Sequence, residues 1–471
     1  MRWAGVKDRG LKKSRSKIES PKKENRGMTT ILDPGMRQDD AKTVTFGEIC
    51  KTFAKIGCLS FGGPAAQIGL MHRIVVDEKR WLSEARFLHA LNYCMLLPGP
   101  EAQQLATYIG WLNGGLRGGV AAGLLFVLPG LAVMLGLSTL YALYHNVGWI
   151  AGLFFGLKAA VLAIVLQALL RIGKRALTSS FHRVIALFAF VALFCLSLPF
   201  PLVVVGAAVA GLISARFAMV DVSPQAAASS PLSLKSVLLS LIVWLCLWLA
   251  PLALLSLLSG HERLLDIFTF FARMALVTFG GAYAVLAYVA QVAVEHYHWL
   301  KPGEMLDGLA LAETTPGPLV LVLSFTGFLA AFRDPGGVMP VVAGLMGGLL
   351  TAWATFAPSF LFIFAGAPLI ERLRGHALVD AALSAITAAV VGVILNLSVW
   401  FGLHVLFAQV VQRDMVAAIG FSLPVPEWTT LNGASLVIAL LTALLLFRFR
   451  LGIATVLATA AALGVAIRFM A

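Results

Sequence analysis

The sequence predicts an all-α polytopic membrane protein built from two inverted homologous halves whose helices are broken by glycine and proline. Composition is the first reason, because 59% of the 471 residues are hydrophobic and only 13% are charged. A soluble chain of this length needs more charge to cover its surface, so the apolar excess must face lipid. An internal repeat is the second reason, and Gly-Pro motifs inside apolar stretches are the third.

Hydrophobic stretches predict where the chain crosses the bilayer. A spanning helix needs about 20 mostly apolar residues, and about 13 stretches meet this criterion. The short pair on either side of Pro199-Phe200-Pro201 is equally compatible with one tilted hairpin. The predicted spans are 46–76, 87–110, 118–143, 149–170, 183–198, 201–217, 236–258, 265–295, 304–331, 337–366, 378–405, 431–447 and 451–467.

The chain divides into four predicted segments: a basic leader (1–45), a first half (46–217), a linker with one extra span (218–263) and a second half (264–471). Residues 1–55 hold 14 Lys or Arg and 7 Asp or Glu, so they carry about half of the net charge of +13. The leader has the composition of a disordered segment, and no apolar core follows soon enough for a signal peptide. We expect it to stay in the cytoplasm, with Met28 or Met36 as alternative start sites.

Several function classes are disfavoured. No basic stripe interleaved with aromatic residues is present, which argues against nucleic-acid binding. The five cysteines form no CxxC pair and are expected to be buried thiols, not disulfides or metal ligands. No HExxH or GxSxG motif points to an enzyme. We therefore expect no metal and no cofactor.

The internal repeat has a constant spacing. Phe61-Gly62-Gly63 recurs as Phe279-Gly280-Gly281, and Pro98-Gly99-Pro100 recurs as Pro316-Gly317-Pro318, both 218 residues later. Further along the chain, Pro129 corresponds to Pro358 at an offset of 229. The change predicts an 11-residue insertion (229 − 218), which we place in the loop 332–337. The same offsets also relate Trp81 to Trp299, Phe53 to Phe271, Lys55 to Arg273, and Ala159-Ala160-Val161 to Ala388-Ala389-Val390.

The predicted span count sets the orientation of the halves. An odd number of spans separates corresponding helices, so the halves should face opposite ways across the membrane. With a cytoplasmic N-terminus, the positive-inside rule agrees for the loop containing Arg171, Lys174, Arg175 and Arg183. The loop 79–86, with Lys79, Arg80 and Arg86, disagrees unless that segment is interfacial or re-entrant. Inverted repeats are typical of alternating-access transporters, which hold substrate between the repeats.

The Phe-Gly-Gly and Pro-Gly-Pro motifs predict broken helices within the membrane. Each Pro-Gly-Pro removes two amide donors, and its Gly permits an unusual backbone. Irregular backbone at membrane depth requires surrounding protein or a water-filled cavity. A helix that restarts there presents free N–H groups and a positive dipole end, which suits an anion. Kinks that allow close packing are the alternative, but matched breaks in both halves favour a binding site.

These motifs resemble the chromate ion transporter family over residues 46–405. The resemblance rests on residues 61–73, Trp81-Leu82, residues 96–106, Leu128-Pro129-Gly130 and residues 313–319. It implies a long, two-half member in the cell inner membrane that exports chromate with the proton motive force and confers chromate resistance. Two positions depart from the family pattern, Ile74 replacing a carboxylate and Ser324 replacing a Gln, and both bear on substrate preference.

Candidate site residues follow from the chemistry of a tetrahedral dianion, which needs amides, hydroxyls or cations. Besides the two Phe-Gly-Gly and two Pro-Gly-Pro motifs, we predict that Lys55, Lys158, Arg273 and Gln103 bind substrate. Lys55 can instead snorkel to the interface, Lys158 can pair with a carboxylate of another span, and Gln103 can bond between helices. Arg273 lies within an apolar helix and needs either the anion or a carboxylate such as Glu313.

Two carboxyl groups flank the breaks and are predicted to couple transport to protons. Glu101 follows the first Pro-Gly-Pro and Glu313 precedes the second. Burial disfavours the charged form, so such groups can carry protons. Helix N-terminal complementation is the alternative for Glu101, and a salt bridge is the alternative for Glu313. A sulfate carrier, an anion channel and, last, a membrane enzyme remain alternative functions. The expected partners are chromate or sulfate, protons and the lipid bilayer, and a homodimer is one option for assembly.

Overall fold

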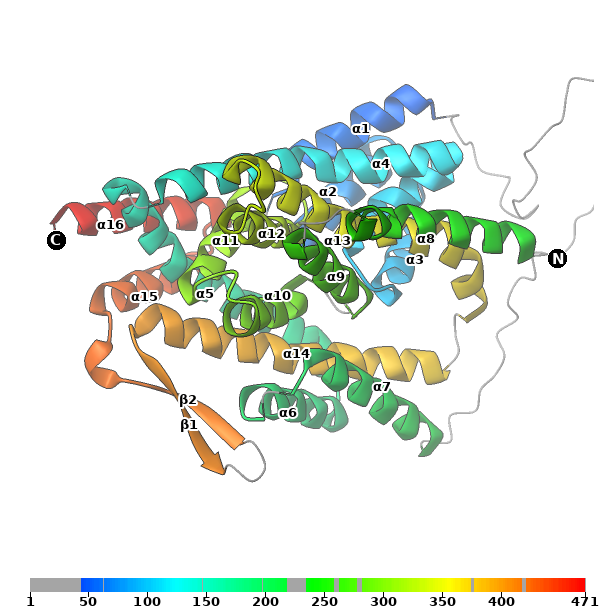
Figure 1. Ribbon diagram of the computed structural model, residues 1–471. Helices are drawn as coiled ribbons and strands as arrows, with labels where there is room; N and C mark the ends of the chain where they lie inside the picture. Colours follow the sequence, from blue (N-terminus) through cyan, green and yellow to red (C-terminus); the bar gives the residue numbers. More distant parts are fainter. Residues whose placement is uncertain are drawn as a thin grey trace, which may run out of the picture. The chain divides into compact units, whose positions relative to one another are not determined.

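The computed structural model describes residues 44–471 apart from 62, 146, 197, 218–233, 258–261, 278–281, 374–376, 417–420 and 471. Most of the predicted leader therefore lies outside the described residues, as do Gly62, Gly280 and Gly281. The described part is almost entirely helical (Figure 1). Its elements up to the extra helix are α1 (Phe46–Leu59), α2 (Gly63–His72), η2 (Arg73–Glu78), α3 (Glu84–Leu96), α4 (Glu101–Tyr144), α5 (Gly148–Ala176), α6 (Ser180–Phe194), α7 (Phe200–Phe217) and α8 (Leu234–Leu257).

The second half repeats this order and adds one antiparallel β-hairpin between α14 and α15. Its elements are α9 (Glu262–Val277), α10 (Ala282–Gln291), η3 (Val292–His296), α11 (Pro302–Thr314), η4 (Leu319–Leu321), α12 (Val322–Arg333), α13 (Pro340–Leu373), α14 (Ala377–Leu406), β1 (Val410–Val416), β2 (Phe421–Pro426), η6 (Trp428–Thr430), α15 (Gly433–Phe447) and α16 (Ile453–Met470).

Unusual local geometry recurs at the spacing of the sequence repeat. A π-helical turn, which is rare in proteins, follows α2 as η2 and follows α10 as η3. The next segment contains Arg80 in one half and His298 in the other, both non-glycine residues with positive φ, at 54° and 53°. The Trp81 amide then donates to the Val75 carbonyl and the Trp299 amide to the Ala293 carbonyl, both at 2.8 Å. The two halves thus share backbone detail as well as motifs.

The helix α4 is a hairpin of two packed arms. Gly114 and Gly115 have non-helical backbone angles and separate the arms. A Cβ added at Gly110 would clash with the backbone of Gly118, so the arms run side by side. In the second half α12 and α13 form the same hairpin, with Gly327 against Gly347. Their connection, from the end of α12 at Arg333 to the start of α13 at Pro340, coincides with the predicted insertion.

Helices α3 and α11 also begin hairpins, each with Pro-Gly-Pro at its tip. The rings of Tyr93 on α3 and Tyr108 on α4 lie 5.2 Å apart, on the same side of the first turn. At the open end of the second hairpin, the Arg333 guanidinium at the end of α12 meets the Glu304 carboxylate in the first turn of α11 at 2.6 Å. The predicted spans 87–110 and 304–331 are therefore bent back on themselves and are not straight crossings.

Corresponding helices of the two halves run antiparallel where they meet. Along α4 and α13, Gly119 lies against Phe364, Gly123 against Phe360, and Leu135 against Gly348. Each step forward along α4 thus matches a step backward along α13. Because Pro129 of α4 corresponds to Pro358 of α13 in the repeat, these are equivalent helices in opposite directions.

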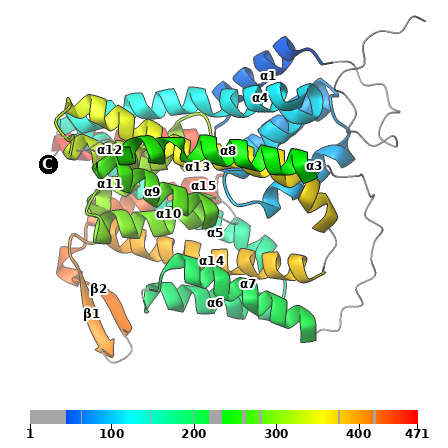
Figure 2. The ribbon, with the colours of Figure 1, turned by 45° about the vertical axis from the view of Figure 1, so that its right-hand side comes forward.

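The ends of the two halves exchange partners. Helix α5 packs against α15 and α16 of the second half, whereas its counterpart α14 packs against α6 and α7 of the first half. Both views show α6 and α7 lying along α14 (Figures 1 and 2). Small residues allow the close approach, since Gly156 faces the Ala460 backbone and Gly392 faces the Ala186 backbone. Neither half could bury these helices alone.

Among the described residues, six helices are long and apolar enough to cross a membrane: the merged α4, α5, residues 237–257 of α8, residues 340–366 of α13, residues 380–406 of α14, and α16. Shorter apolar helices include α6, α7 and α15. Large apolar side chains such as Leu187, Phe188 and Leu257 are exposed, as expected for a lipid-facing surface. The protein is therefore a polytopic helical membrane protein, while the count of 13 full spans is not confirmed.

The close approach of the two α4 arms predicts the effect of a single methyl group. Gly110→Ala should lower the thermal midpoint, because the new Cβ must push against the Gly118 backbone and Ala122, a cost of about 1–3 kcal/mol. Gly136→Ala on the same helix is the matched control, because nothing lies within 4 Å of its added Cβ. Both are measured by thermal unfolding in detergent, and equal midpoints would contradict the hairpin packing.

Candidate functional site

The second Pro-Gly-Pro turn is held in place by the first half. Gly317 adopts φ of 90°, which favours glycine. Its amide donates to the Ser60 carbonyl at 2.8 Å, and its carbonyl accepts from the Gln67 side chain at 2.6 Å. The adjacent Pro316 carbonyl packs against Gly130, where any side chain would clash. The turn between α11 and α12 is therefore bound by α2, α4 and the break after α1.

The first Pro-Gly-Pro turn has the reciprocal arrangement with the second half. Gly99 has φ of 116°, and a Cβ added there would lie 3.5 Å from the Ser359 hydroxyl of α13. The Gln104 side chain donates to the Pro98 carbonyl at 2.7 Å, and Gln103 donates to the Phe356 carbonyl of α13 at 3.4 Å. Ser359 occupies the position equivalent to Gly130, so each turn meets the same point of the opposite half.

Helices begin at both turns and at the first Phe-Gly-Gly break. Helix α2 starts at Gly63, whose φ is 78°, α4 starts at Glu101, and η4 leads into α12 from Leu319. The first amides of a helix have no partner within it and form its positive dipole end. Gln67 joins the start of α2 to the second turn directly. These N-termini are therefore suited to an anion at the interface of the halves.

Buried polar atoms without a hydrogen-bond partner gather at the same turns. Among the described residues they include the hydroxyl oxygens of Ser60, Thr355 and Ser359, each side chain at most 5% exposed. Such groups are costly to bury unpaired. A hydroxyl can donate to an anion, and each glutamine amide that bonds a carbonyl keeps a second N–H. The turns thus offer neutral donors for a tetrahedral oxyanion.

The two predicted coupling carboxyls occupy different positions relative to their turns. Glu101 is the first residue of α4, immediately after Pro100, and is partly buried. Glu313 is buried in the last turn of α11, with 5% of its surface exposed. One carboxyl thus directly follows the first Pro-Gly-Pro turn, and the other precedes the second turn by three residues (316 − 313).

Two predicted cations have exposed side chains. Lys55 on α1 and Arg273 on α9 are both exposed. Arg273 forms no ion pair with a carboxylate in the part of the chain that the structure describes, so the alternative of an Arg273–Glu313 pair is not observed. The substrate-binding role of both cations stays a prediction.

The third predicted cation, Lys158, pairs with a carboxylate of another helix. Its ammonium lies 3.0 Å from the Asp307 carboxylate of α11, which is the alternative considered from the sequence. The same oxygen of Asp307 accepts from the Tyr141 hydroxyl at 2.7 Å. Lys158 therefore forms an ion pair with a helix of the second half in this structure.

Sequence reasoning missed several residues of the site. Gln67 lies one helical turn after Gly63, and Ser359 follows the repeated Pro358, so the repeat could have identified both. Ser60 directly precedes the first Phe-Gly-Gly motif. Asp307 gave a weaker signal, because a lone acidic residue in a predicted span does not reveal its partner.

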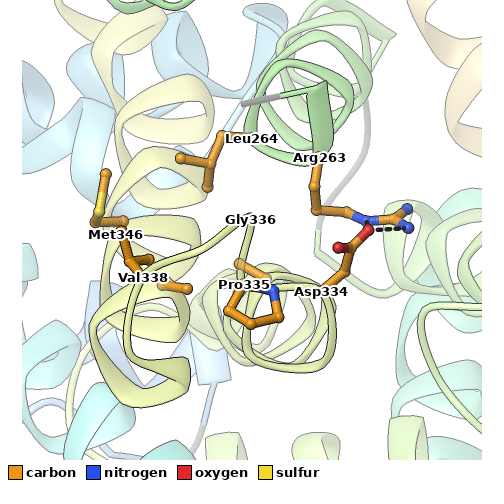
Figure 3. Close-up of a pocket in the computed structure, with 9 residues that line it drawn as sticks. Arg263, Leu264, Asp334, Pro335, Gly336, Val338 and Met346 are labelled. Atoms are coloured by element: carbon orange, nitrogen blue, oxygen red, sulfur yellow. Dashed lines mark hydrogen bonds and ion pairs between the residues drawn. The ribbon is translucent and has the colours of Figure 1, made fainter. Parts of the chain in front are cut away.

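A surface pocket lies elsewhere, between the start of α9 and the connection from α12 to α13 (Figure 3). Its charged side chains neutralise each other, since the Arg263 guanidinium binds the Asp334 carboxylate through two nitrogens at 2.8 and 3.1 Å. Leu264, Pro335 and Met346 complete an apolar lining. This pocket lies at a loop and has no unpaired charge among its lining residues. It is therefore a weaker candidate for an anion site than the two Pro-Gly-Pro turns.

Known proteins share both the motifs and most of the chain. The family model described as chromate transporter matches residues 47–212 and 265–465. A chromate transport protein of Pseudomonas aeruginosa is 36% identical over 359 residues, covering 74% of this chain and 80% of that protein. One of Cupriavidus metallidurans is 30% identical over 365 residues, covering 75% of this chain and 82% of that protein.

A probable chromate transport protein of Synechococcus elongatus is 29% identical over 357 residues, covering 75% of this chain and 84% of that protein. No solved structure matches the chain significantly. The family model covers the two regions that contain the repeated turns. The chain belongs to the chromate transporter family.

Proposed function

We propose that this protein exports chromate across the inner membrane by alternating access, driven by the proton motive force. The observation that carries the proposal is the reciprocal pair of Pro-Gly-Pro turns, each held by the opposite half and each at the start of a helix. Helix N-termini and neutral donors at the interface of two repeats suit a tetrahedral dianion. The relatives named as chromate transport proteins support the choice of substrate.

The two halves, 46–217 and 264–471, are inverted in this proposal, with 218–263 as a linker that carries α8. The antiparallel packing of α4 and α13 supports inversion, because these helices occupy equivalent places in the repeat. The reciprocal packing of α5 and α14 supports it too. Alternating access then exchanges the conformations of the two halves around the turns.

The hairpins remove the conflict in the positive-inside argument. Ile49 in the first turn of α1 lies against Gly114 and Gly118, so α1 starts at the end of the molecule where the α4 arms join. His72 at the end of α2 bonds Glu84 at the start of α3 at 2.6 Å. The segment 79–86 therefore belongs to the N-terminal end, together with the basic loop 171–183. We assign this end to the cytoplasm.

The charge of chromate makes the membrane potential a direct driving force. Moving one elementary charge through 100 mV is worth about 2.3 kcal/mol, so a dianion leaving a negative interior gains about 4.6 kcal/mol. This corresponds to a concentration ratio of roughly a thousandfold or more. The membrane potential alone is therefore sufficient to drive export of the dianion.

Flux into everted vesicles tests the function. Energised vesicles containing this protein should accumulate chromate, and collapse of the potential should abolish accumulation. Gln104→Leu removes a donor beside Gly99, so it should weaken chromate affinity by roughly 5- to 150-fold, equivalent to about 1–3 kcal/mol. Gln167→Leu on α5, far along the chain from either turn, should behave as the unaltered protein.

The same assay separates the alternatives. Sulfate has the shape and charge of chromate, so each anion should compete with the other, and the ratio of their affinities decides: a sulfate carrier would accumulate sulfate at lower concentrations than chromate. Flux that fails to saturate with concentration would favour a channel. No accumulation of chromate in energised vesicles would refute the proposed function.

The coupling role of Glu101 and Glu313 is tested by removing their titratable protons. Glu101→Gln and Glu313→Gln nearly preserve shape, so each variant should still bind chromate. If either carboxyl carries the coupling proton, its variant should lose the response of transport to a pH gradient. Binding is measured by chromate protection against thermal unfolding, and flux by the vesicle assay. An unchanged pH response in both variants would exclude these carboxyls.

The proposed topology predicts which loops a membrane-impermeant reagent reaches in intact cells. Single cysteines at Arg80 and Arg175 should be protected, because both belong to the cytoplasmic end. A cysteine at Asp334 should react, because the α12–α13 connection lies at the opposite end. Labelling of Arg80→Cys without permeabilisation would overturn the hairpin topology, while permeabilised cells serve as the control for reactivity.

A further inference from the structure

A polar cluster joins α11 of the second half to α4 and α5 of the first half. Asp307 on α11 has a side chain only 2% exposed, and one of its carboxylate oxygens accepts from Tyr141 of α4 and Lys158 of α5. The cluster therefore connects the Pro-Gly-Pro hairpin of the second half to two helices of the first. The pairs Arg263–Asp334 and Arg333–Glu304, by contrast, involve no residue of the first half.

The cluster is poorly explained as a stabilising contact. Burying an ion pair costs desolvation that its attraction often fails to repay, so such a pair is weak evidence for stability. The second oxygen of Asp307 is buried and has no hydrogen-bond partner among the described residues. Lys158 keeps 30% of its side chain exposed and reaches Asp307 past Gly303, where an added Cβ would lie 2.9 Å from the ammonium. A carboxylate held in this way can be neutralised by a proton.

The titratable and charged neighbours of Asp307 come from α4, α5, α11 and α12. Tyr141 belongs to α4 and stacks on His145 at 5.1 Å, and Lys158 belongs to α5. Glu304 lies one turn earlier on α11 and is itself neutralised by Arg333 of α12. Asp307 is therefore the carboxyl through which the second half contacts Lys158.

The cluster breaks the symmetry of the repeat. The offsets place His89, Ile370 and Thr387 at the positions equivalent to Asp307, Tyr141 and Lys158. A lysine–aspartate pair is thus encoded at one end of the protein and not at the other. Inverted repeats reach their two states by exchanging conformations, so a contact present at one end favours the state in which that end is closed.

We propose that Lys158, Asp307 and Tyr141 form a proton-operated latch that closes the end of the transporter opposite its N-terminus. A proton from solvent binds a carboxylate oxygen of Asp307, the carboxyl becomes neutral, and Lys158 is released. The hairpin of α11 and α12 then parts from α4 and α5 and opens a path to the turns. The inference rests on the proposed inverted repeat and is independent of which anion is carried.

Thiol accessibility tests the latch without using transport. Ser60 is 1% exposed at the central break, so Ser60→Cys, in a protein whose five native cysteines are replaced, reports opening. A membrane-impermeant thiol reagent is added to intact cells, and each rate is divided by that of denatured protein at the same pH. Asp307→Asn mimics the protonated state and should raise the normalised rate at least about tenfold. At about pH 5.5 the unaltered latch should open similarly, whereas Asp307→Asn should not respond to pH.

Matched variants separate the latch from general loosening. Asp334→Asn breaks an ion pair that involves no residue of the first half and should leave the rate unchanged. Gly303→Val keeps all charges but displaces Lys158, so it should raise the rate as Asp307→Asn does. If Asp307→Asn fails to insert, the double neutral variant Lys158→Gln, Asp307→Asn replaces it, because it leaves no unpaired buried charge. Equal rates and equal pH responses in latch variants and unaltered protein would overturn the proposal, even if chromate export is established.

Discussion

The structure depends on satisfying the backbone of two turns that lie inside an apolar environment. Each Pro-Gly-Pro turn interrupts a helical hairpin and exposes peptide groups that lipid cannot bond. Gly317 solves this by bonding Ser60 and Gln67, which belong to the other half. The Gly99 turn packs against Ser359 of the opposite half, and the neighbouring Gln103 donates to the Phe356 carbonyl there. The two halves therefore form one folding unit, and the site arises where they supply each other's missing partners.

A frame of long helices keeps the turns in register. The antiparallel contact of α4 with α13 runs past both turns, since Gly130 faces one and Ser359 faces the other. Helix α5 packs against α15 and α16, and α14 packs against α6 and α7. These contacts between the halves hold the outer helices to the frame. The hairpins are attached to the frame through close packing at small residues, such as Gly327 against Gly347, and through hydrogen bonds such as the bond from Gln67 to Gly317.

The sequence was informative where a motif demanded one backbone geometry. Gly63, Gly99 and Gly317 all adopt positive φ at the predicted breaks, because only glycine reaches that conformation easily. Hairpins were not predicted, since two half-length helices around a turn have the same apolar length as one span. The exposure of Arg273 was not predicted, because hydropathy averages over all faces of a helix, whereas exposure depends on one face. The Asp307 partners are 149 and 166 residues away in sequence (307 − 158 and 307 − 141), beyond the reach of any local pattern.

Residues that differ between the two halves can make the halves behave differently, whereas identical repeated residues cannot. Two identical inverted halves would give two states of equal energy, and neither end would be preferred. Any preference must come from residues that differ between halves, and the charged differences near the core are few. Glu101 corresponds to Leu319, Glu313 corresponds to Met95, and Lys158 corresponds to Thr387. Lys158 forms an ion pair with Asp307 of the opposite half at 3.0 Å, whereas its counterpart Thr387 has no charge to form one.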